Sequence, residues 1–506
     1  MKLLKKAAER GFVCTILSGT ADVDVTDLCF DSRKVQPGCL FVCMRGANFD
    51  SHEIVKQIAE AGAAAIVVDR TCDMPDGVTM VLVSDTREAL ARLSAAWFDF
   101  PAEKMITIGV TGTKGKTTTT HMIRALLEKS GRKTGLIGTN GIAIGSSHEP
   151  TRNTTPESYE IQKAFAEMAA EGCSCAVMEV SSQGLMLHRT GGIRFDYGVF
   201  LNISPDHIGP NEHKSFEEYL MWKTRLFAQC RTGLVNADDP HAGAVRDASE
   251  CERLLTFGES KGADFCAEKI RAVREQNFAG LALDFLAPGQ EPLAVRIGIP
   301  GRFNAGNALA ALSVCALIGV PREILAGGLS DIRVNGRMEI ALTHPFTVII
   351  DYAHNAVSME ALLDTLREYH PKRLVVVFGC GGNRAKERRY SMGEIAGKKA
   401  DFSIITADNS RFEPVEDILA DIRGSIEKTG GKFTEIPDRR EAIFYAVRNA
   451  GEGDMIAVIG KGHEDYQEIN GVRHHFVDRE VVDEALRERF GAEEAERGGK
   501  SRGGAE

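Results

Sequence analysis

MITIGVTGTKGKTT, at residues 105–118, is the segment with the clearest indication of fold in the chain. Its first six residues, 105–110, form a short apolar run rich in β-branched side chains, which is typical of a buried strand. A turn rich in glycine and threonine follows, and residues 118–129 then carry a helical pattern. Strand, loop and helix in this order begin a βαβ unit, so the segment predicts an α/β fold with a parallel sheet.

The turn has the composition of a phosphate-binding loop. Its glycines allow backbone N–H groups to point at phosphate oxygens, and the following helix adds the positive end of its dipole. The Lys116 ammonium can reach the β- and γ-phosphates, and the Thr117 hydroxyl suits Mg²⁺. We therefore predict that ATP and Mg²⁺ bind here. The nucleotide-binding residues of the loop are Gly112, Thr113, Lys114, Gly115, Lys116, Thr117 and Thr118.

The loop alone does not name a reaction. A nucleotide-driven switch or an ATPase motor would use the same kind of loop, but it would also need a water-positioning residue and switch segments. The sequence offers no clear candidate for either. An ATP-consuming enzyme is therefore the favoured interpretation.

The length of 506 residues is too great for one hydrophobic core and predicts about three domains. In the last third of the chain, strand candidates alternate with helical patterns, at 347–351, 373–378, 402–406 and 455–459. This alternation predicts a doubly wound parallel sheet with ligands at the strand carboxyl ends. We expect a first domain at 1–101, a central phosphate-loop domain with a parallel sheet at 102–332, a Rossmann-like C-terminal domain at 333–490 and a disordered tail at 491–506.

The composition excludes several classes of protein. A formal net charge of −10 argues against nucleic-acid binding. No apolar stretch reaches the roughly 18 residues that span a bilayer, and no signal peptide is recognisable, so we expect a cytoplasmic protein without membrane insertion. The twelve cysteines lack zinc-site spacing, which favours reduced thiols. The expected partners are small-molecule substrates, and we expect a monomer.

Further motifs follow in order through nearly the whole chain. They are MEVSS at 178–182, NISPDH at 202–207, GRFN at 301–304, NGRME at 335–339, DYAHN at 351–355 and GKGHE at 460–464. With the compressed loop GTKGKTT, this series resembles the Mur ligases, and among them the enzymes that form a UDP-linked tripeptide of the bacterial cell wall. The resemblance implies that ATP converts a substrate carboxylate to an acyl phosphate, which an amino acid then attacks. Folylpolyglutamate synthetases share the loop and are a more remote alternative, because they should lack the first domain.

The resemblance also implies which residues carry the phosphoryl-transfer chemistry. A carboxylate and a triphosphate repel each other, so the site needs fixed cations and Mg²⁺. Lys223 matches a lysine that is carbamylated in the family, and a carbamate, unlike an ammonium, can bind a metal ion. The implied metal ligands are Thr117, Glu179, His207 and carbamylated Lys223. The implied catalytic residues are Lys116, Glu179, His207, Lys223 and Arg337, and those around adenine and ribose are Asn304, Asp351 and His354. A non-catalytic UDP-sugar-binding protein would not need these groups together.

The acceptor is expected to bind to the first two domains. Ser32 and His52 match the uridine-diphosphate region of the family. The residues implied at its peptide and sugar are Thr154, Thr155, Ser181 and Arg189. Two nearby positions depart from the diaminopimelate-adding pattern, because Gln183 stands where histidine is usual and Leu187 where glutamine is usual. Leu187 cannot make the amide hydrogen bonds of glutamine.

The added amino acid is predicted from DNSR at 408–411, which resembles DNPR of the diaminopimelate-adding enzymes. Diaminopimelate differs from lysine by a distal carboxylate, and the Arg411 guanidinium can bind that group through two parallel hydrogen bonds. The implied contacts are Arg389, Asp408, Asn409, Arg411, Gly460 and Glu464. We therefore predict meso-diaminopimelate. L-Lysine, or another diamino acid, is the alternative, because Ser410 replaces proline and residues 201–213 resemble the lysine-adding enzymes.

Overall fold

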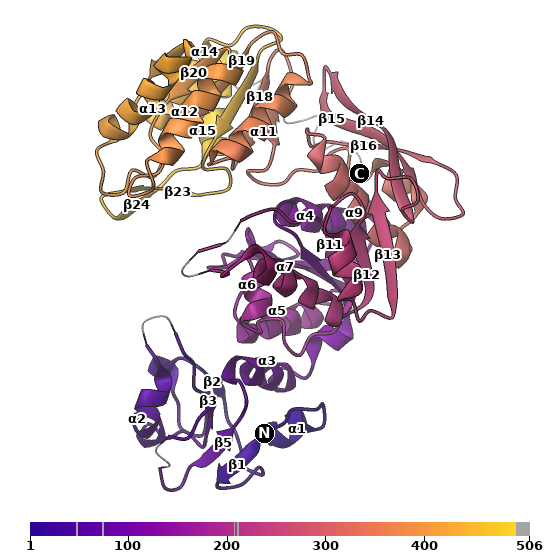
Figure 1. Ribbon diagram of the computed structural model, residues 1–506, viewed down its shortest axis with the longest axis vertical. Coiled ribbons are helices and arrows are strands. Elements are labelled where there is room, and N and C mark those ends of the chain that lie inside the picture. Colours follow the sequence, from indigo (N-terminus) through magenta and orange to yellow (C-terminus); the bar gives the residue numbers. More distant parts are fainter. Residues whose placement is uncertain (47–48, 73–74, 207, 210–211, 492–506) are drawn as a thin grey trace. The chain divides into compact units, whose positions relative to one another are not determined.

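The computed structural model describes residues 1–46, 49–72, 75–206, 208–209 and 212–491 (Figure 1). The chain divides into two compact units, Met1–Cys266 with Leu309–Pro321, and Ala267–Ala308 with the chain from Arg322 onward. Three large sheets lie in successive stretches of sequence, and each is mainly parallel with helices between its strands. The predicted α/β fold with three domains is thus confirmed.

The amino-terminal sheet is parallel apart from one edge strand. Strand β1 pairs antiparallel with β5, and the remaining pairs are parallel. In sheet order its strands are β1 (Thr15–Ser18), β5 (Thr79–Leu82), β4 (Ala65–Val68), β3 (Leu40–Val42) and β2 (Leu28–Cys29). The helices of this stretch are α1 (Leu3–Ala8), α2 (Val55–Glu60), α3 (Thr86–Trp97) and the 3₁₀ turns η1 (Ser32–Lys34), η2 (Ser51–Ile54) and η3 (Pro101–Lys104). Asp85 caps α3 by accepting from two backbone N–H groups, which explains why the helix begins at Thr86.

The central sheet is built around β6 (Ile106–Thr111). This strand pairs in parallel with both β10 and β11, so the phosphate loop at its carboxyl end lies between the ends of two neighbouring strands. Its other strands in this unit are β7 (Thr134–Gly138), β8 (Gly141–Ile144), β9 (Ser147–Glu149), β10 (Cys175–Glu179), β11 (Phe195–Phe200), β12 (Cys230–Asn236) and β13 (Arg253–Gly258). Its helices are α4 (Lys116–Lys129), α5 (Ser158–Ala170), α6 (Ser182–Met186), α7 (Phe216–Thr224), η4 (Arg225–Ala228) and α8 (Ala242–Asp247).

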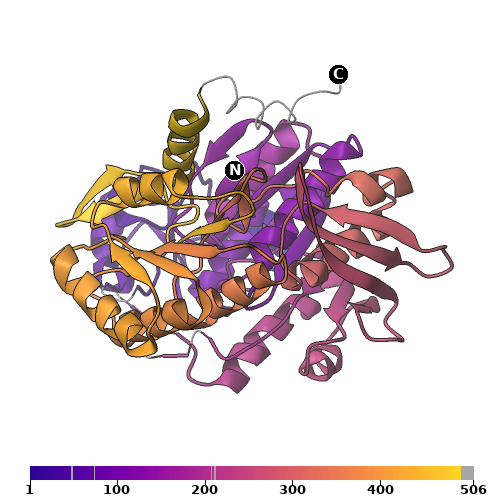
Figure 2. The ribbon, with the colours of Figure 1, turned by 90° about the horizontal axis from the view of Figure 1, so that it is seen from above.

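A connecting stretch follows, with long antiparallel strands that Figure 2 shows in rose. It contains β14 (Phe265–Glu275), β15 (Phe278–Leu286), β16 (Leu293–Ile297), α9 (Phe303–Ile318) and α10 (Arg322–Gly327). Strands β15 and β16 pair antiparallel. Helix α9 contributes residues to both compact units.

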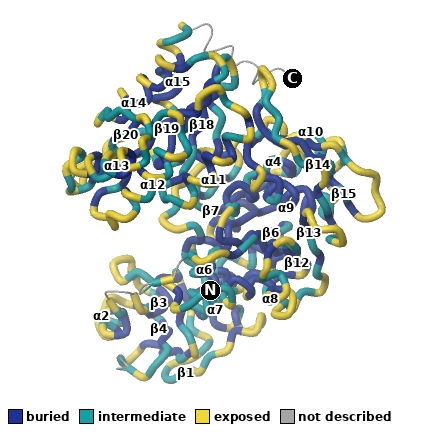
Figure 3. The backbone as a smooth tube through the Cα atoms, turned by 45° about the horizontal axis from the view of Figure 1, so that its top comes forward, coloured by how far each residue is buried: buried dark blue, intermediate teal, exposed yellow. Residues whose placement is uncertain are grey.

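The carboxyl-terminal sheet has the order β17-β18-β22-β19-β20-β21, and all its pairs except β17–β18 are parallel. Its strands are β17 (Glu339–Leu342), β18 (Thr347–Asp351), β19 (Leu374–Phe378), β20 (Phe402–Ile405), β21 (Phe433–Glu435) and β22 (Met455–Ile459), and a hairpin follows with β23 (Tyr466–Ile469) and β24 (Val472–His475). Its helices are α11 (Ala356–Arg367), α12 (Glu387–Lys399), α13 (Val415–Thr429), α14 (Arg439–Arg448) and α15 (Asp478–Phe490). The inner strands β18, β19, β20 and β22 are largely buried, whereas α12 and α13 alternate buried and exposed positions (Figure 3).

The structure matches most of the local expectations and moves one boundary. The predicted strand at 105–110 is β6, and the four strand candidates of the last third are β18, β19, β20 and β22. The helix after the loop begins at Lys116 rather than residue 118, so Lys116 and Thr117 belong to its first turn. No helix among the described residues is long and apolar enough to span a membrane. The predicted tail lies outside the described residues from 492 onward.

The core of the carboxyl-terminal sheet provides a test of this fold. Ile456 lies in β22 between β18 and β19 and is fully buried. We expect Ile456→Ala to lower the free energy of unfolding by about 2–5 kcal/mol, because it removes buried methyl groups and leaves a cavity. The matched control is Val357→Ala, at a position that is 77% exposed on α11, which should change stability by less than about 0.5 kcal/mol. Urea titration measures the free energy of unfolding of both variants. Equal losses in the two variants would contradict the central position of β22 in the sheet.

Candidate functional site

The phosphate loop connects β6 to α4 and is bound on one side by Asn202, which follows β11. The Thr113 N–H donates to the Asn202 backbone carbonyl at 3.0 Å. The Asn202 side chain accepts from the Lys114 N–H at 3.0 Å and donates to the Lys114 carbonyl at 3.1 Å. Gly115 has φ +87°, a conformation that favours glycine, directly before the helix. These contacts fix the loop's backbone in an open turn at the helix N-terminus, where anions bind.

Two predicted catalytic lysines share one acceptor in this loop. The Gly112 carbonyl accepts from Lys116 Nζ at 2.8 Å and from Lys223 Nζ at 2.9 Å. Lys223 lies on α7 and is only 1% exposed, although a lysine on such a helix is ordinarily solvated. Burial, and then the neighbouring charge of Lys116, hold the pKa of Lys223 well below its usual value. The structure therefore brings Lys223 to the phosphate loop in surroundings that disfavour its charged form.

Glu179 ends β10 and is buried beside the first turn of α4. Both of its carboxylate oxygens accept from Thr117 Oγ1 at 3.0 Å. Thr139, which the sequence did not single out, donates its N–H at 2.8 Å and its hydroxyl at 3.2 Å. A Cβ on Gly138 would lie 2.4 Å from Glu179 Oε1, so any side chain here would displace the carboxylate. The carboxylate is thus fixed by three donors beside the loop.

The predicted metal ligands can be tested for their fit to Mg²⁺. Thr117 and Glu179 present oxygen atoms beside the loop, and magnesium prefers oxygen ligands. Lys223 would fit only after its amine has become a carbamate, which also presents oxygen. His207 lies outside the described residues. Among the residues that the structure does describe, no three His, Cys, Asp or Glu side chains form a metal-binding group by themselves.

The residues predicted at the acceptor peptide surround the Glu179 backbone. Thr155 Oγ1 donates to the Glu179 carbonyl at 2.9 Å and accepts from the Ser181 N–H at 2.9 Å. Thr154 Oγ1 lies 3.0 Å from Thr139 Oγ1, and Ser181 Oγ caps α6. Arg189 donates to the Thr155 carbonyl at 3.0 Å. Its guanidinium is also paired with Glu157 at 2.6 Å. The structure therefore brings all four predicted residues together.

The two predicted uridine-site residues lie in separate turns. Ser32 is exposed in η1. His52 is buried in η2, where Nδ1 lies 2.6 Å from Asp50 Oδ1 and Nε2 lies 3.3 Å from Asp69 Oδ1. Arg70 pairs with Asp50 at 2.6 Å. The buried His52 ring is thus held by two partly exposed carboxylates, whereas Ser32 is exposed.

The residues predicted around the nucleotide in the carboxyl-terminal part lie at the end of β18. Asp351 accepts from the backbone N–H groups of Met338 and Ala353, each at 2.8 Å, and its burial raises its pKa. The Arg337 guanidinium lies 4.8 Å from the ring centroid of Tyr352, and the His354 ring lies 4.7 Å from it. These residues form one group. Asn304 is separate at the start of α9, where it donates to the Pro300 carbonyl at 2.6 Å.

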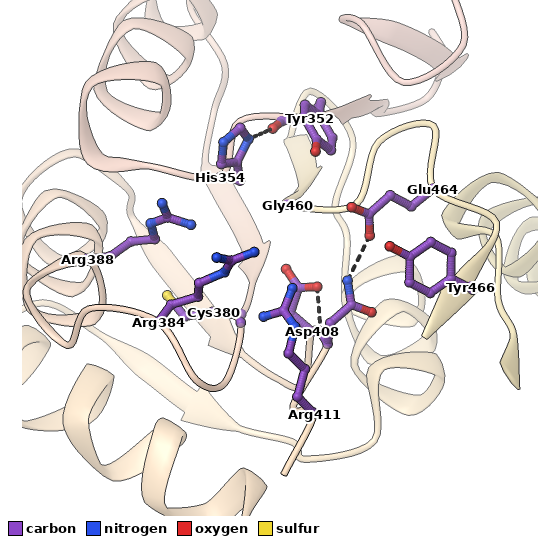
Figure 4. Close-up of a pocket in the computed structure, with 13 residues that line it drawn as sticks. Tyr352, His354, Cys380, Arg384, Arg388, Asp408, Arg411, Gly460, Glu464 and Tyr466 are labelled. Atoms are coloured by element: carbon purple, nitrogen blue, oxygen red, sulfur yellow. Dashed lines mark hydrogen bonds between the residues drawn. The ribbon is translucent and has the colours of Figure 1, made fainter. Parts of the chain in front are cut away.

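A cavity of about 470 Å³ opens at the carboxyl ends of β18, β19, β20 and β22 (Figure 4). Its position is the one predicted for ligands of a doubly wound sheet. It is lined by Tyr352, His354, Gly379, Cys380, Gly381, Arg384, Arg388, Asp408, Asn409, Arg411, Gly460, Glu464 and Tyr466. The structure therefore brings together every predicted amino-acid contact except Arg389.

The cavity is lined by three arginines and by the carboxylates of Asp408 and Glu464. Figure 4 shows Arg384 and Arg388 on the side opposite Glu464. Glu464 Oε2 accepts from Asn409 Nδ2 at 2.9 Å and from Lys461 Nζ at 3.1 Å. Arg411 Nη1 donates to the Gly382 carbonyl at 2.7 Å, which orients its guanidinium at the cavity wall. Such a cavity suits a ligand that carries both carboxylates and ammonium groups.

Arg389 does not line this cavity. It is 1% exposed, and it donates to Glu413 Oε2 at 2.7 Å and to Asp421 Oδ2 at 2.9 Å. The neighbouring Arg388 and the preceding Arg384 line the cavity instead. The run NRAKERR at 383–389 places several cationic side chains close to the end of a strand. Which of them face the cavity depends on where the helix begins, and the sequence does not show this.

Three segments of the chain match family models for Mur ligases. Residues 24–98 match "Mur ligase family, catalytic domain", residues 110–315 match "Mur ligase middle domain" and residues 336–462 match "Mur ligase, glutamate ligase domain". The three segments follow one another along the chain and contain, in turn, strands of the amino-terminal, central and carboxyl-terminal sheets.

Whole-chain comparisons give the same result. A UDP-N-acetylmuramoyl-L-alanyl-D-glutamate–2,6-diaminopimelate ligase from Caldanaerobacter subterraneus subsp. tengcongensis is 40% identical over 474 residues, which is 93% of this chain and 97% of that relative. One from Alkaliphilus metalliredigens is 39% identical over 479 residues, 93% of this chain and 95% of that relative. A solved structure of a ligase of this name has a TM-score of 0.71 at 30% identity and covers 92% of this chain and 95% of its own. By sequence and by fold, the chain belongs to the Mur ligase family of ATP-dependent acid–amino-acid ligases.

Proposed function

We propose that this enzyme adds meso-diaminopimelate to UDP-N-acetylmuramoyl-L-alanyl-D-glutamate in peptidoglycan precursor synthesis, as a cytoplasmic monomer. The carrying observation is a cavity lined by Arg384, Arg388, Arg411 and Glu464, with Arg384 and Arg388 on the side opposite Glu464 (Figure 4). Diaminopimelate has two carboxylates and two ammonium groups, and guanidinium groups bind carboxylates through paired hydrogen bonds. The relatives with 40% and 39% identity carry the name of this activity.

L-Lysine is the competing amino acid, and the cavity disfavours it. At its distal carbon, lysine has only an ammonium, whereas diaminopimelate has an ammonium and a carboxylate. Lysine would therefore leave Arg411 paired with Glu468 alone, at 3.7 Å, and would forgo the paired hydrogen bonds of a ligand carboxylate. A folylpolyglutamate synthetase-like activity fits less well, because the amino-terminal sheet with Ser32 matches a Mur ligase segment.

The chain's own residues support the first half-reaction. The acceptor carboxylate attacks the γ-phosphorus of ATP, the bond from that phosphorus to the β-bridging oxygen breaks, and ADP leaves with the bond's electron pair. Lys116, in the phosphate loop, would bind the phosphoryl oxygens, and the family resemblance gives Arg337 a catalytic role as well. Thr155, Ser181 and Arg189 position the acceptor peptide. Mg²⁺, held by Thr117, Glu179, His207 and carbamylated Lys223, would neutralise phosphate charge.

The second half-reaction joins the amino acid to the activated carboxyl group. The uncharged amine of diaminopimelate forms a C–N bond at the acyl carbon, inorganic phosphate leaves with the electron pair of the C–O bond, and the amine loses a proton. Asp408, Asn409, Gly460 and Glu464 line the cavity that would hold the amino acid. Their role is to orient the attacking nitrogen.

Carbamylation of Lys223 is supported by its surroundings. A carbamate forms when an uncharged amine bonds to the carbon of CO₂ and releases a proton. An ammonium cannot react in this way. Lys223 shares the Gly112 carbonyl with Lys116 and is 1% exposed, so the uncharged amine is the form that fits.

The substrate assay tests the proposed function directly. Purified enzyme with ATP, Mg²⁺ and the UDP-linked dipeptide should release phosphate with meso-diaminopimelate and at least about 100-fold more slowly with L-lysine or ornithine. Phosphate release is measured as a function of amino-acid concentration. Use of lysine alone would overturn the choice of amino acid, and the absence of release with every amine would overturn the ligase proposal.

Arg411 provides a test of the distal-carboxylate contact. We expect Arg411→Ala to raise KM for diaminopimelate by about 10- to 100-fold, because hydrogen bonds between charged groups are lost, while KM for ATP stays within about twofold. The control is Phe412→Ala, since Phe412 is 69% exposed and does not line the cavity. An unchanged KM for diaminopimelate in Arg411→Ala would contradict the assignment.

Lys223 provides a test of the carbamate. Lys223→Ala should lower kcat by at least about 100-fold, because an anionic group beside the phosphates is lost, and added formate or acetate should restore part of the activity. The matched control is Lys163→Ala on α5, where the lysine is 54% exposed and pairs with Glu167. Full activity of Lys223→Ala without added acid would contradict a catalytic role for the Lys223 carbamate.

A further inference from the structure

A fully buried ion pair lies beneath the amino-acid cavity. Arg439 is the first residue of α14 and Asp478 is the first residue of α15, and both side chains are 0% exposed. Arg439 Nε donates to Asp478 Oδ1 and Nη2 donates to Asp478 Oδ2, each at 2.7 Å. This two-bond geometry fixes the plane of the guanidinium. Asp478 is also favourably placed at a helix N-terminus.

The same guanidinium also contacts two backbone carbonyls at the ends of sheet strands. Nη2 donates to the Ile459 carbonyl at 2.9 Å and Nη1 lies 3.5 Å from the Ala407 carbonyl. Ile459 is the last residue of β22 and directly precedes Gly460. Ala407 follows β20 and directly precedes Asp408. Because β19 lies between these two strands in the sheet, no strand pairing joins them directly.

We propose that Arg439, oriented by Asp478, is a positioning residue that sets the spacing between the two loops that bind the added amino acid. The inference rests on the proposed function, since it concerns the same cavity. The loops are 408–411 and 460–464, and across the cavity they are joined by the hydrogen bond from Asn409 Nδ2 to Glu464 Oε2 at 2.9 Å. A displacement of either strand end would break that bond and separate Arg411 from Glu464. Displacements near 1 Å at substrate-positioning groups are enough to lower catalytic efficiency strongly.

Stability alone does not explain this arrangement. Two buried charges gain little over well-packed apolar side chains of similar volume, because both have lost their hydration. The Arg439 guanidinium also donates to two carbonyls at strand ends and so holds these ends at a fixed distance. Apolar side chains cannot do this. The distinction can be measured, because an apolar replacement keeps the packing and removes only the hydrogen bonds.

The same sheet offers a matched control at its opposite edge. Arg373 directly precedes β19 and Asp454 directly precedes β22, and Arg373 Nη2 donates to Asp454 Oδ2 at 2.6 Å. Asp454 is 1% exposed but Arg373 is 47% exposed, so the pair controls for an arginine–aspartate link between strands and not for full burial. This pair therefore joins two strands at their amino ends, and neither residue lines the cavity.

The first experiment compares Arg439→Lys with Arg373→Lys in the full-length enzyme. Lysine keeps the charge but cannot make the paired hydrogen bonds. We expect Arg439→Lys to raise KM for diaminopimelate by about 10-fold, with kcat and KM for ATP within about twofold, and Arg373→Lys to leave all three within about twofold. An unchanged KM in Arg439→Lys, or an equal change in Arg373→Lys, would overturn the proposal.

The second experiment separates positioning from folding and needs no substrate. Hydrogen–deuterium exchange of the apo-protein should be faster in 408–411 and 460–464 for the double variant Arg439→Met/Asp478→Leu, while its thermal midpoint stays near that of wild type. Unchanged exchange in both loops would overturn the positioning role. If wild-type enzyme fails to use diaminopimelate, the proposed function fails, and the exchange result still decides whether Arg439 orders the loops.

Discussion

One backbone carbonyl, that of Gly112, accepts hydrogen bonds from two lysines. Two ammonium groups that share an acceptor in a buried site repel each other strongly. Lys116 has a second acceptor in the Thr113 carbonyl, at 3.2 Å. Lys223 Nζ lies 4.6 Å from the centroid of the Tyr219 ring, and burial together with the charge of Lys116 lowers its pKa. The packing of α7 against the loop therefore favours the uncharged form of this lysine.

The remaining chemistry is arranged by the parallel sheets. In the central sheet, β6 and β10 end side by side, so the phosphate loop and Glu179 meet without any long connection. In the carboxyl-terminal sheet, four strand ends surround the cavity. Because adjacent loops leave parallel strands at one edge, residues far apart in sequence, such as Asp408 and Glu464, become neighbours. A central guanidinium beneath that edge fixes how far apart the strand ends lie.

The fold was largely predictable, and particular side chains were not. An apolar run followed by a glycine turn predicted β6 and its loop, because backbone conformation is set by local sequence. The position of Arg389 could not be read in this way, since Arg388 and Arg389 are adjacent and only the register of α12 decides which one reaches the cavity. Likewise, Glu217 and Glu218 make α7 look solvated, although Lys223 on the same helix is buried. No sequence pattern marks Thr139, because its hydrogen bonds to Glu179 depend on the pairing of β7 with β10.

The central claim is that Lys223 is an uncharged amine that CO₂ can modify. Carbon-13 NMR of the enzyme equilibrated with ¹³C-bicarbonate at neutral pH measures this directly. The account predicts a carbamate carbon resonance in the wild-type enzyme that is absent from Lys223→Arg. A wild-type spectrum without that resonance, together with a Lys223 that titrates in the ordinary range of lysine, would contradict it.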